Sequence, residues 1–325
     1  MWLRYCFIFL LCFMPFLSNA QIGTFQDIGS GAQQPIISIS PSFPGPGQPF
    51  TATIEDYSGA LFGSETMWTY DGVLVEGATN QRTVELTAGA AGSNQSLRVD
   101  IGSPNGSSKT VTRSINPLYI DIIIEPQTRV PDWYAGRSLP SLGSQINATA
   151  LLHNGTQFLN ANQIVYTWQV DQNVLENGSI RGGNKVSFET PRGSAPTVIL
   201  TVADLQGTTL AKRAVRITSV QPDIEYYEKH SLYGMRNRPL QSNAALIGNV
   251  LTLQAEPFNL DARVYNRPDI AQWEINSIET SNGIANPYEI TLSRSGVGGR
   301  TVLNFHVRSL SEVLQGAKAN VVVNF

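Results

Sequence analysis

The stretch MWTYDGVLVEG, residues 67–77, predicts a strand, a tight turn and the start of a second strand. Trp68 lies in the first strand, and Asp71-Gly72 is a residue pair that two-residue hairpin turns prefer. The pattern recurs around Trp168 in VYTWQVDQNVLENG (165–178) and around Trp273 in AQWEINSIETSNG (271–283). The tryptophans are 100 residues (68 to 168) and 105 residues (168 to 273) apart. This spacing indicates a repeated β domain rather than a short solenoid repeat.

Alternating strands flank each tryptophan in the same order. The strand upstream of the tryptophan is PFTATIEDYSG (49–59), INATALLHNG (146–155) or LTLQAEPFNL (251–260). The last strand of each unit is KTVTRSIN (109–116), KRAVRITSV (212–220) or AKANVVVNF (317–325). Strict alternation gives each strand one buried and one wet face, and Gly and Asn pairs between strands provide the turns. We therefore predict an all-β chain of three tandem antiparallel β-sandwiches, with helix confined to a turn near Leu310-Ser311-Glu312.

These residues resemble the immunoglobulin-like superfold, specifically the disulfide-free Ig-like and PKD-like domains that occur in tandem on bacterial cell-envelope proteins. Trp68-Thr-Tyr-Asp71-Gly72 matches the tryptophan strand and hairpin of such domains, and Trp168 and Trp273 take the corresponding places. The resemblance covers residues 35–325. Residues 226–234 are also similar to a motif in uncharacterised multi-Ig envelope proteins of small-genome bacteria, some of which accompany type IV pilus components. The cysteine pair of antibody-type domains is missing.

The N-terminus predicts a secretory signal peptide over residues 1–20. Arg4 precedes an apolar run (7–17), and Ser18-Asn19-Ala20 places small residues where a signal peptidase reads them. The expected location is therefore exported: periplasmic, cell-surface or extracellular. No second hydrophobic stretch of spanning length follows, so we expect no transmembrane segment in the mature chain.

The two cysteines, Cys6 and Cys12, both fall within this signal. The mature chain is therefore expected to lack disulfides and thiolate ligands. A lipoprotein signal that uses Cys12 is the alternative, and Leu11 disfavours it because a small residue is expected before such a cysteine.

The remaining chain, about 305 residues, is too long for one sandwich and suits two or three domains of about 100 residues each. We predict a flexible leader at 21–34 and Ig-like domains at 35–117, 118–221 and 222–325. Pro117 and Pro222 mark the boundaries, because proline cannot donate to a strand ladder. These joints are short, so we expect adjacent domains to touch and to form a stiff rod.

The composition and motifs exclude several function classes. A net charge of −3 and 14% charged residues offer nothing that recruits nucleic acid. His153, His230 and His306 have no carboxylate or serine at a motif spacing, so we expect no catalytic residues and no enzyme activity. No calcium-loop motif is present, and Asp204, Asp261 and Asp269 are interpreted as turn residues. We expect neither a metal site nor a cofactor.

Two groups of aromatic residues need separate interpretations. Recurrence in every unit indicates that Trp68, Trp168 and Trp273 form the structural cores. Candidate partner or ligand contacts lie in loops and at the domain junctions: Trp133, Tyr134, Arg137, Tyr226, Tyr227 and Tyr233. Aromatic residues there either stack on sugars, anchor a protein partner or fill the space between neighbouring domains.

The functional expectation is a non-enzymatic structural, adhesive or docking protein of the bacterial cell envelope. Its partner would be another envelope protein, and a surface appendage such as a type IV pilus is the more specific form of this hypothesis. The alternatives are carbohydrate binding through the loop aromatics, with a surface glycan as ligand, and an accessory region of a secreted hydrolase. The C-terminal NVVVNF (320–325) is interpreted as the last strand of the third unit, with a donor strand as the alternative.

Overall fold

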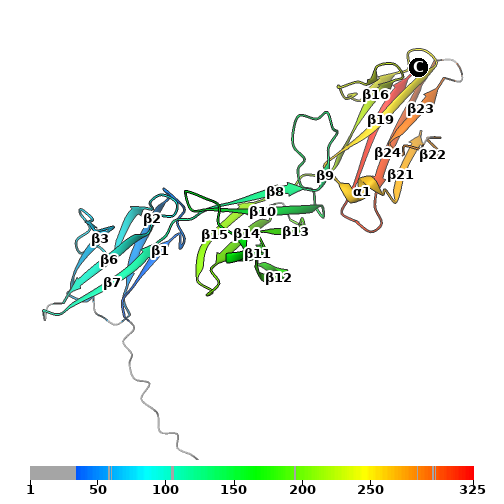
Figure 1. Ribbon diagram of the computed structural model, residues 1–325. Helices are drawn as coiled ribbons and strands as arrows, with labels where there is room; N and C mark the ends of the chain where they lie inside the picture. Colours follow the sequence, from blue (N-terminus) through cyan, green and yellow to red (C-terminus); the bar gives the residue numbers. More distant parts are fainter. Residues whose placement is uncertain are drawn as a thin grey trace, which may run out of the picture.

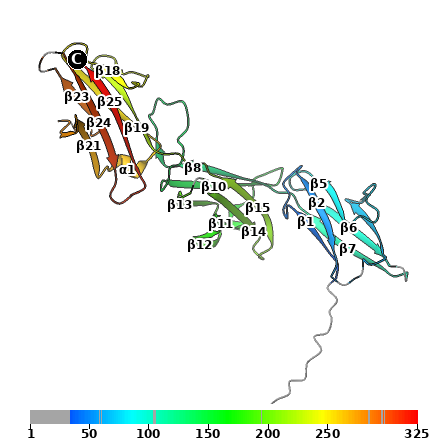
Figure 2. The same ribbon diagram turned by 180° about the vertical axis from the view of Figure 1, so that it is seen from behind.

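The computed structural model describes residues 34–325, except 58, 60, 104, 105, 194, 284, 295 and 297. The predicted signal peptide (1–20) and nearly all of the leader (21–34) lie outside the described residues. Figures 1 and 2 show three β-sandwiches that follow one another along the chain in an extended row. Each has its own hydrophobic core, which confirms the predicted fold class.

The first sandwich packs a three-stranded sheet, β1-β2-β5, against a four-stranded sheet, β4-β3-β6-β7. All pairings are antiparallel. The strands are β1 (Ile36–Ser40), β2 (Pro49–Glu55), β3 (Glu65–Tyr70), β4 (Val73–Leu74), β5 (Thr83–Thr87), β6 (Gln95–Gly102) and β7 (Ser108–Ile115).

The second sandwich repeats this plan with sheets β13-β10-β8 and β12-β11-β14-β15. A single 3₁₀ turn, η1 (Ala161–Gln163), precedes β11. The strands are β8 (Tyr119–Pro126), β10 (Gln145–His153), β11 (Val165–Val170), β12 (Asn173–Arg181), β13 (Lys185–Glu189), β14 (Thr197–Ala203) and β15 (Thr209–Arg216).

The third sandwich has sheets β17-β16-β19-β23 and β18-β25-β24-β21-β22. Its strand β18 pairs in parallel with β25, whereas the other pairings are antiparallel. The strands are β16 (Asp223–His230), β17 (Gly234–Met235), β18 (Asn243–Ala245), β19 (Val250–Phe258), β21 (Ile270–Ile275), β22 (Ile278–Thr280), β23 (Glu289–Ser293), β24 (Arg300–Arg308) and β25 (Gly316–Asn324).

A small two-stranded sheet connects the second and third sandwiches. Strand β9 (Thr128–Arg129) leaves the second sandwich and pairs with β20 (Leu260–Asp261) of the third. The helix α1 (Ala262–Asn266) follows β20 directly.

The three tryptophans hold equivalent positions. Trp68, Trp168 and Trp273 are 0%, 3% and 2% exposed. Each indole N–H donates to a backbone carbonyl 13 to 15 residues further along the chain, at 2.8–2.9 Å: to Gln81, Gly183 and Pro287 respectively. A buried indole needs such an acceptor, because an unpaired N–H in an apolar core is destabilising.

The sequence made two local predictions, a helical turn near Leu310 and a final strand at 320–325. The helical turn expected near Leu310 is absent, and the short helices are η1 and α1 instead. α1 forms because the Asp261 side chain accepts from the N–H of Arg263 and so caps its first turn. The C-terminal segment is the last strand of the third sandwich: β25 pairs with both β24 and β18.

Strand ends bracket the predicted boundaries. β7 ends at Ile115 and β8 begins at Tyr119, while β15 ends at Arg216 and β16 begins at Asp223. We retain domains at 35–117, 118–221 and 222–325 as a proposal.

Candidate functional site

Hydrogen bonds and ion pairs cross the joint between the second and third sandwiches at several places. The loop 127–143 leaves β8 and reaches the third sandwich, where β9 pairs with β20. Asn259, with a φ of 58°, donates its N–H to the Arg129 carbonyl at 2.7 Å, and its side-chain oxygen accepts from the Leu139 N–H at 2.9 Å. Asparagine tolerates this left-handed conformation better than most residues. The turn that starts β20 therefore also holds both ends of the loop.

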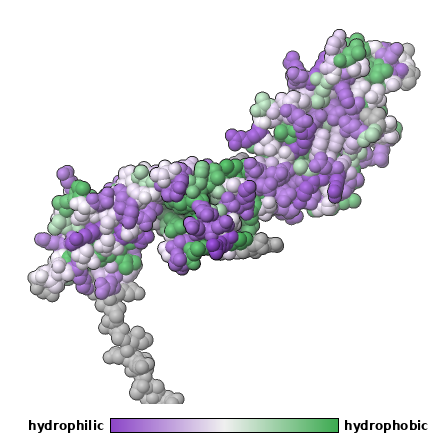
Figure 3. Space-filling model, viewed as in Figure 1, coloured by the Kyte–Doolittle hydropathy of each residue, from purple (hydrophilic) through white to green (hydrophobic). Residues whose placement is uncertain are grey.

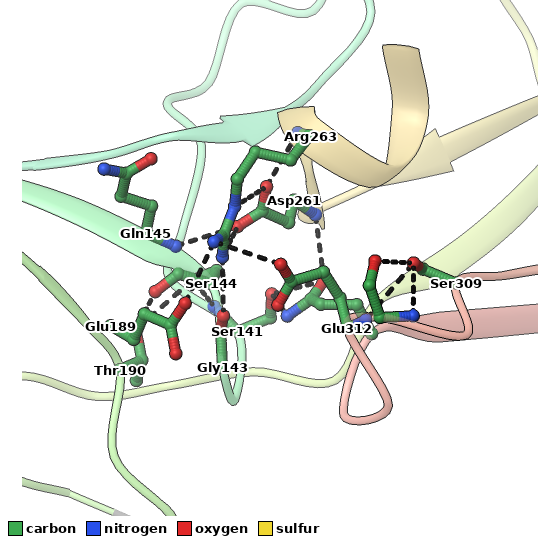
Figure 4. Close-up of polar contacts among 12 residues, drawn as sticks. Ser141, Gly143, Ser144, Gln145, Glu189, Thr190, Asp261, Arg263, Ser309 and Glu312 are labelled. Atoms are coloured by element: carbon green, nitrogen blue, oxygen red, sulfur yellow. Dashed lines mark hydrogen bonds and ion pairs between the residues drawn. The ribbon is translucent and has the colours of Figure 1, made fainter. Parts of the chain in front are cut away.

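Asp261 lies at the centre of the joint (Figure 4). Its side chain is fully buried. The carboxylate accepts a 2.8 Å hydrogen bond from the N–H of Gln145 in the second sandwich and a 2.7 Å bond from the N–H of Arg263. The Arg263 guanidinium adds two bonds of 3.0 Å through Nε and Nη2. Charge-assisted hydrogen bonds of this kind offset the cost of taking the carboxylate out of water.

Arg263 connects Asp261 to both neighbouring surfaces. Its Nη1 lies 2.9 Å from a carboxylate oxygen of Glu189 at the end of β13, and 3.2 Å from one of Glu312. Its Nη2 also donates to the Gly143 carbonyl at 3.1 Å. The Asp261 carboxylate is the main reason that the pKa of Arg263 is raised above its usual value. The planar fork of arginine suits this several-sided recognition in a way that lysine could not.

A second set of hydrogen bonds, centred on the uncharged side chain of Gln315, lies beside the ion pairs of Asp261 and Arg263. The Gln315 amide, 1% exposed, donates to the Ser141 hydroxyl at 3.0 Å and the Leu142 carbonyl at 2.6 Å. Its oxygen accepts from the N–H of Asp261 at 2.9 Å. In this way Gln315, from the third sandwich, fastens the turn that begins at Ser141 in the second. Buried networks in which every group is paired have one favoured geometry.

The loop aromatics pack against the third sandwich. Trp133 meets the ring of Tyr227 edge-on at 4.9 Å between centroids, and Tyr134 meets Phe258 at 5.4 Å. The Arg129 guanidinium lies 5.1 Å from the centroid of the Tyr265 ring. Trp133 and Tyr134 remain 41% and 44% exposed. Trp133 and Tyr134 are therefore each packed into the joint on one side of the ring and exposed to solvent on the other.

The remaining candidate residues lie apart from this pair. Tyr226 belongs to the core of the third sandwich, where its hydroxyl donates to the Ala319 carbonyl at 3.0 Å. Tyr233 is 85% exposed and neighbours only the ring of His230 among the described aromatics. Arg137 is an exposed residue of the 127–143 loop. The structure thus brings Trp133 and Tyr227 together but does not gather the six residues into one surface.

Glu256 is a second buried carboxylate at this joint, and it is poorly paired. It is 5% exposed, and its Oε2 has no hydrogen-bond partner in the structure. Burial raises the pKa of Glu256, while the nearby Arg129 guanidinium and a hydrogen bond from Gln254 counteract part of that rise. Burial likewise raises the pKa of Tyr227 to about 12, with the charges of Glu225 and Glu256 adding to the effect.

Sequence reasoning missed Asp261 and Arg263. Asp261 was interpreted as a turn residue, but it is a buried cap and the central acceptor of the joint. The available signal was an Asp followed two residues later by Arg, directly after an alternating strand. That pattern indicates a helix cap, and nothing in it identifies Gln145 or Glu189 as distant partners. Asp204 does lie in a turn, where it accepts from the N–H groups of Gln206 and Thr208.

The arrangement can hold two bodies together, and its charges are directed at each other. The carboxylates of Asp261, Glu189 and Glu312 are all bound by Arg263. Within the part of the chain that the structure describes, no group of three or more His, Cys, Asp or Glu residues could hold a metal ion. No described helix is long and apolar enough to cross a bilayer.

Comparisons with known proteins find matches among solved structures alone. No protein-family model and no curated protein sequence matches the chain. Among solved structures, the three N-terminal domains of the bacteriophage RB49 outer capsid protein Hoc align over 90% of this chain and 97% of that one, with 10% identity and a TM-score of 0.24.

Two further solved structures show the same level of similarity. A Bacteroides ovatus mixed-linkage glucan utilization protein, SGBP-B, solved with a heptasaccharide, aligns over 90% of this chain and 70% of its own, with 14% identity and a TM-score of 0.24. The fibronectin(III)-like modules of Clostridium thermocellum CbhA align over 57% and 95%, with 13% identity and a TM-score of 0.24.

Proposed function

We propose that this chain is a non-enzymatic structural and docking protein of the bacterial cell envelope, in which a stiff row of sandwiches holds contact surfaces at fixed separations. One observation carries the proposal: the buried carboxylate of Asp261 joins the second and third sandwiches through Gln145 and Arg263. Domains joined by a bare linker move freely relative to one another. A joint closed by a paired, buried network does not.

The contacts on either side of Asp261 support this interpretation. β9 pairs with β20, and the linker residue Val220 donates its N–H to the Pro140 carbonyl at 2.9 Å. Gln315 and Asn259 add bonds from the third sandwich to the loop 127–143. Bending this joint would therefore break several hydrogen bonds together, including those to a buried charge. Such a joint suits a spacer that keeps its two ends at a fixed distance and angle, rather than a flexible linker.

Fractionation of bacteria that express residues 1–325 tests the location. Export predicts that the protein accumulates outside the cytoplasm with Gln21 as its first residue by mass spectrometry. Photo-crosslinking in the envelope, followed by peptide sequencing, then identifies the docking partner, and recovery of appendage subunits would support the pilus form of the proposal. Retention of the uncleaved chain in the cytoplasm would contradict it.

Carbohydrate binding is the second candidate, favoured by the exposed edges of Trp133 and Tyr134. It requires rings that a sugar can cover, whereas these rings stand at 69° and 86° to the partners they pack against. A glycan array with wild type and a Trp133→Ala/Tyr134→Ala variant separates the two functions. We expect no glycan signal that depends on these rings, and a reproducible signal lost in the variant would make glycan binding the function.

A further inference from the structure

The joint between the first and second sandwiches is built differently from the second joint. Two glycines allow the backbones of the two sandwiches to lie in close contact. A Cβ on Gly92 would collide with the Asn154 carbonyl oxygen, and one on Gly155 with the Ala91 carbonyl oxygen. Both have positive φ values, 78° and 93°. No ion pair crosses this joint among the residues that the structure describes. Close backbone contact replaces the charged network.

This contact leaves a groove open beside it. A hollow of about 720 Å³ has apolar walls from both sandwiches, with Phe43 and Pro44 on one side and Leu118, Leu159 and Leu210 on the other. A smaller hollow of about 220 Å³ continues from it and shares Phe43 and Leu118. Figure 3 shows hydrophobic surface over the middle sandwich on the side toward the first joint. Clefts between domains are common binding sites.

The charges that border the groove are mainly positive. Arg113 lines the larger hollow, and Lys212 and Arg213 line the smaller one. None of the three forms an ion pair with a described residue. Asp121 is the carboxylate that lines either hollow, and it accepts from the N–H of Ile122 at 2.9 Å. Arg113 donates through Nη1 to the Ile37 carbonyl at 3.0 Å, which anchors the side chain without neutralising its charge. The surface therefore presents an apolar floor with cations at its rim that have no carboxylate partner among the described residues.

Two sheet edges meet at the smaller hollow. β8 is the terminal strand of its sheet and contributes residues 119–121, and β15 is the terminal strand of the other sheet and contributes residues 211–213. A terminal strand has backbone N–H and C=O groups along one side that its own sheet does not pair. Extended peptides bind such edges through main-chain hydrogen bonds, with alternate side chains entering pockets.

We propose that this groove binds an extended segment of a partner protein whose apolar side chains are flanked by carboxylates. The apolar side chains would enter the hollow lined by Phe43 and Leu118, the carboxylates would meet Arg113, Lys212 and Arg213, and the backbone would follow the strand edges. Opposite charge at the rim sets partner choice and association rate. The inference rests on the proposed docking role, but its test measures peptide binding and not stiffness or location, so each can fail without the other.

The experiment pans a library of displayed random peptides of about nine residues, enough to span about 30 Å, against residues 21–325. A Lys212→Glu/Arg213→Glu variant serves for counter-selection. The matched control is Lys185→Glu/Lys318→Glu, which makes the same charge change at exposed strand positions away from the groove. Fluorescence anisotropy then measures each selected peptide and its counterpart with lysine in place of Asp and Glu.

We expect the selected peptides to carry Asp or Glu beside apolar residues. The groove variant should lose at least about tenfold in affinity for them, the control variant less than about twofold, and lysine counterparts should not bind. Failure to enrich any peptide over the groove variant, enrichment of basic peptides, or equal loss in both variants would overturn the proposal. A separate experiment titrates laurate, an apolar chain with one carboxylate, into the wild-type protein. Saturable laurate binding without peptide binding would show that the groove takes a small amphiphile, and would also overturn it.

Discussion

The Asp261 carboxylate of the third sandwich accepts a 2.8 Å hydrogen bond from the backbone N–H of Gln145 in the second. Because the donor is backbone, the bond fixes the position of β10 itself rather than a movable side chain. Arg263 forms an ion pair with the same carboxylate and also with those of Glu189 and Glu312. The two sandwiches thereby share one buried charge.

Replacing Asp261 by Asn should loosen the joint and destabilise the chain. The change removes the charge that Arg263 pairs with and puts an amide NH₂, itself a donor, where one carboxylate oxygen accepted hydrogen bonds. Arg263 is partly exposed, so we expect the free energy of unfolding to fall by about 2–3 kcal/mol rather than by the full value for a buried pair. Chemical denaturation measures this. Asp204→Asn, in an exposed turn, is the control and should change stability by less than about 0.5 kcal/mol.

Glu256 should make stability depend on pH in an uncommon direction. Burial raises its pKa in the folded chain above the value of 4.5 that an unfolded carboxyl has, so the folded state binds the proton more tightly. Its contribution is therefore most favourable below the unfolded pKa and is lost as pH rises through the folded pKa. Arg129, Asp132, Gln254, Tyr227 and Tyr288 interact with it, and Glu225 lies opposite it in the register of β16 and β19.

The Glu256→Gln variant tests this dependence in denaturant titrations between pH 4 and pH 8. We expect the variant to gain stability relative to wild type as pH rises, and the two to converge near the acidic end. Glu279→Gln, at an exposed position of β22, should show no such trend. A variant that loses stability toward neutral pH would mean that ionised Glu256 is stabilised in the joint.

Each core tryptophan should stabilise its own sandwich. Trp168→Phe removes the 2.8 Å bond to the Gly183 carbonyl and part of the buried ring. We expect a loss of about 2–3 kcal/mol, from the unpaired carbonyl together with the cavity. Trp68→Phe and Trp273→Phe should act likewise. Calorimetry should show a different transition shifted by each substitution, and equal shifts of every transition would contradict three separate cores.

The first joint should be sensitive to a single methyl group. Gly92→Ala places a Cβ against the Asn154 carbonyl oxygen and should push the first two sandwiches apart. Gly207→Ala is the matched control, because Gly207 has a similar positive φ of 87° but nothing within 4 Å of its added Cβ. Both share backbone strain of about 1 kcal/mol, so a change in scattering dimensions seen only for Gly92→Ala isolates the contact. Equal changes would mean that strain alone is responsible.

The fold was accessible from the sequence because it depends on local patterns. Alternation set the buried face of each strand, and the recurring Trp68, Trp168 and Trp273 marked equivalent positions that the hydrogen bonds to Gln81, Gly183 and Pro287 also share. The joint was not accessible in the same way. Asp261 meets Gln145 over 116 residues and Gln315 meets Ser141 over 174, and neither partner has a local signature.

The loop 127–143 shows the same difference between what a local pattern predicts and what distant contacts determine. Trp133 and Tyr134 were identified as loop aromatics that either bind a ligand or fill a junction. Their contacts with Tyr227 and Phe258 depend on the path of the loop 127–143, which β9 determines by pairing with β20. A strand of two residues lies below what alternation can predict.

Distances between spin labels on the second and third sandwiches show whether the joint between them holds one orientation. From residue 21 onward the chain has no cysteine, so labels at Lys185→Cys in β13 and Lys318→Cys in β25 report on one sandwich each. We expect a single narrow distance distribution for the otherwise wild-type chain, and a broad one once Asp261→Asn is added. A broad distribution with Asp261 intact would contradict it.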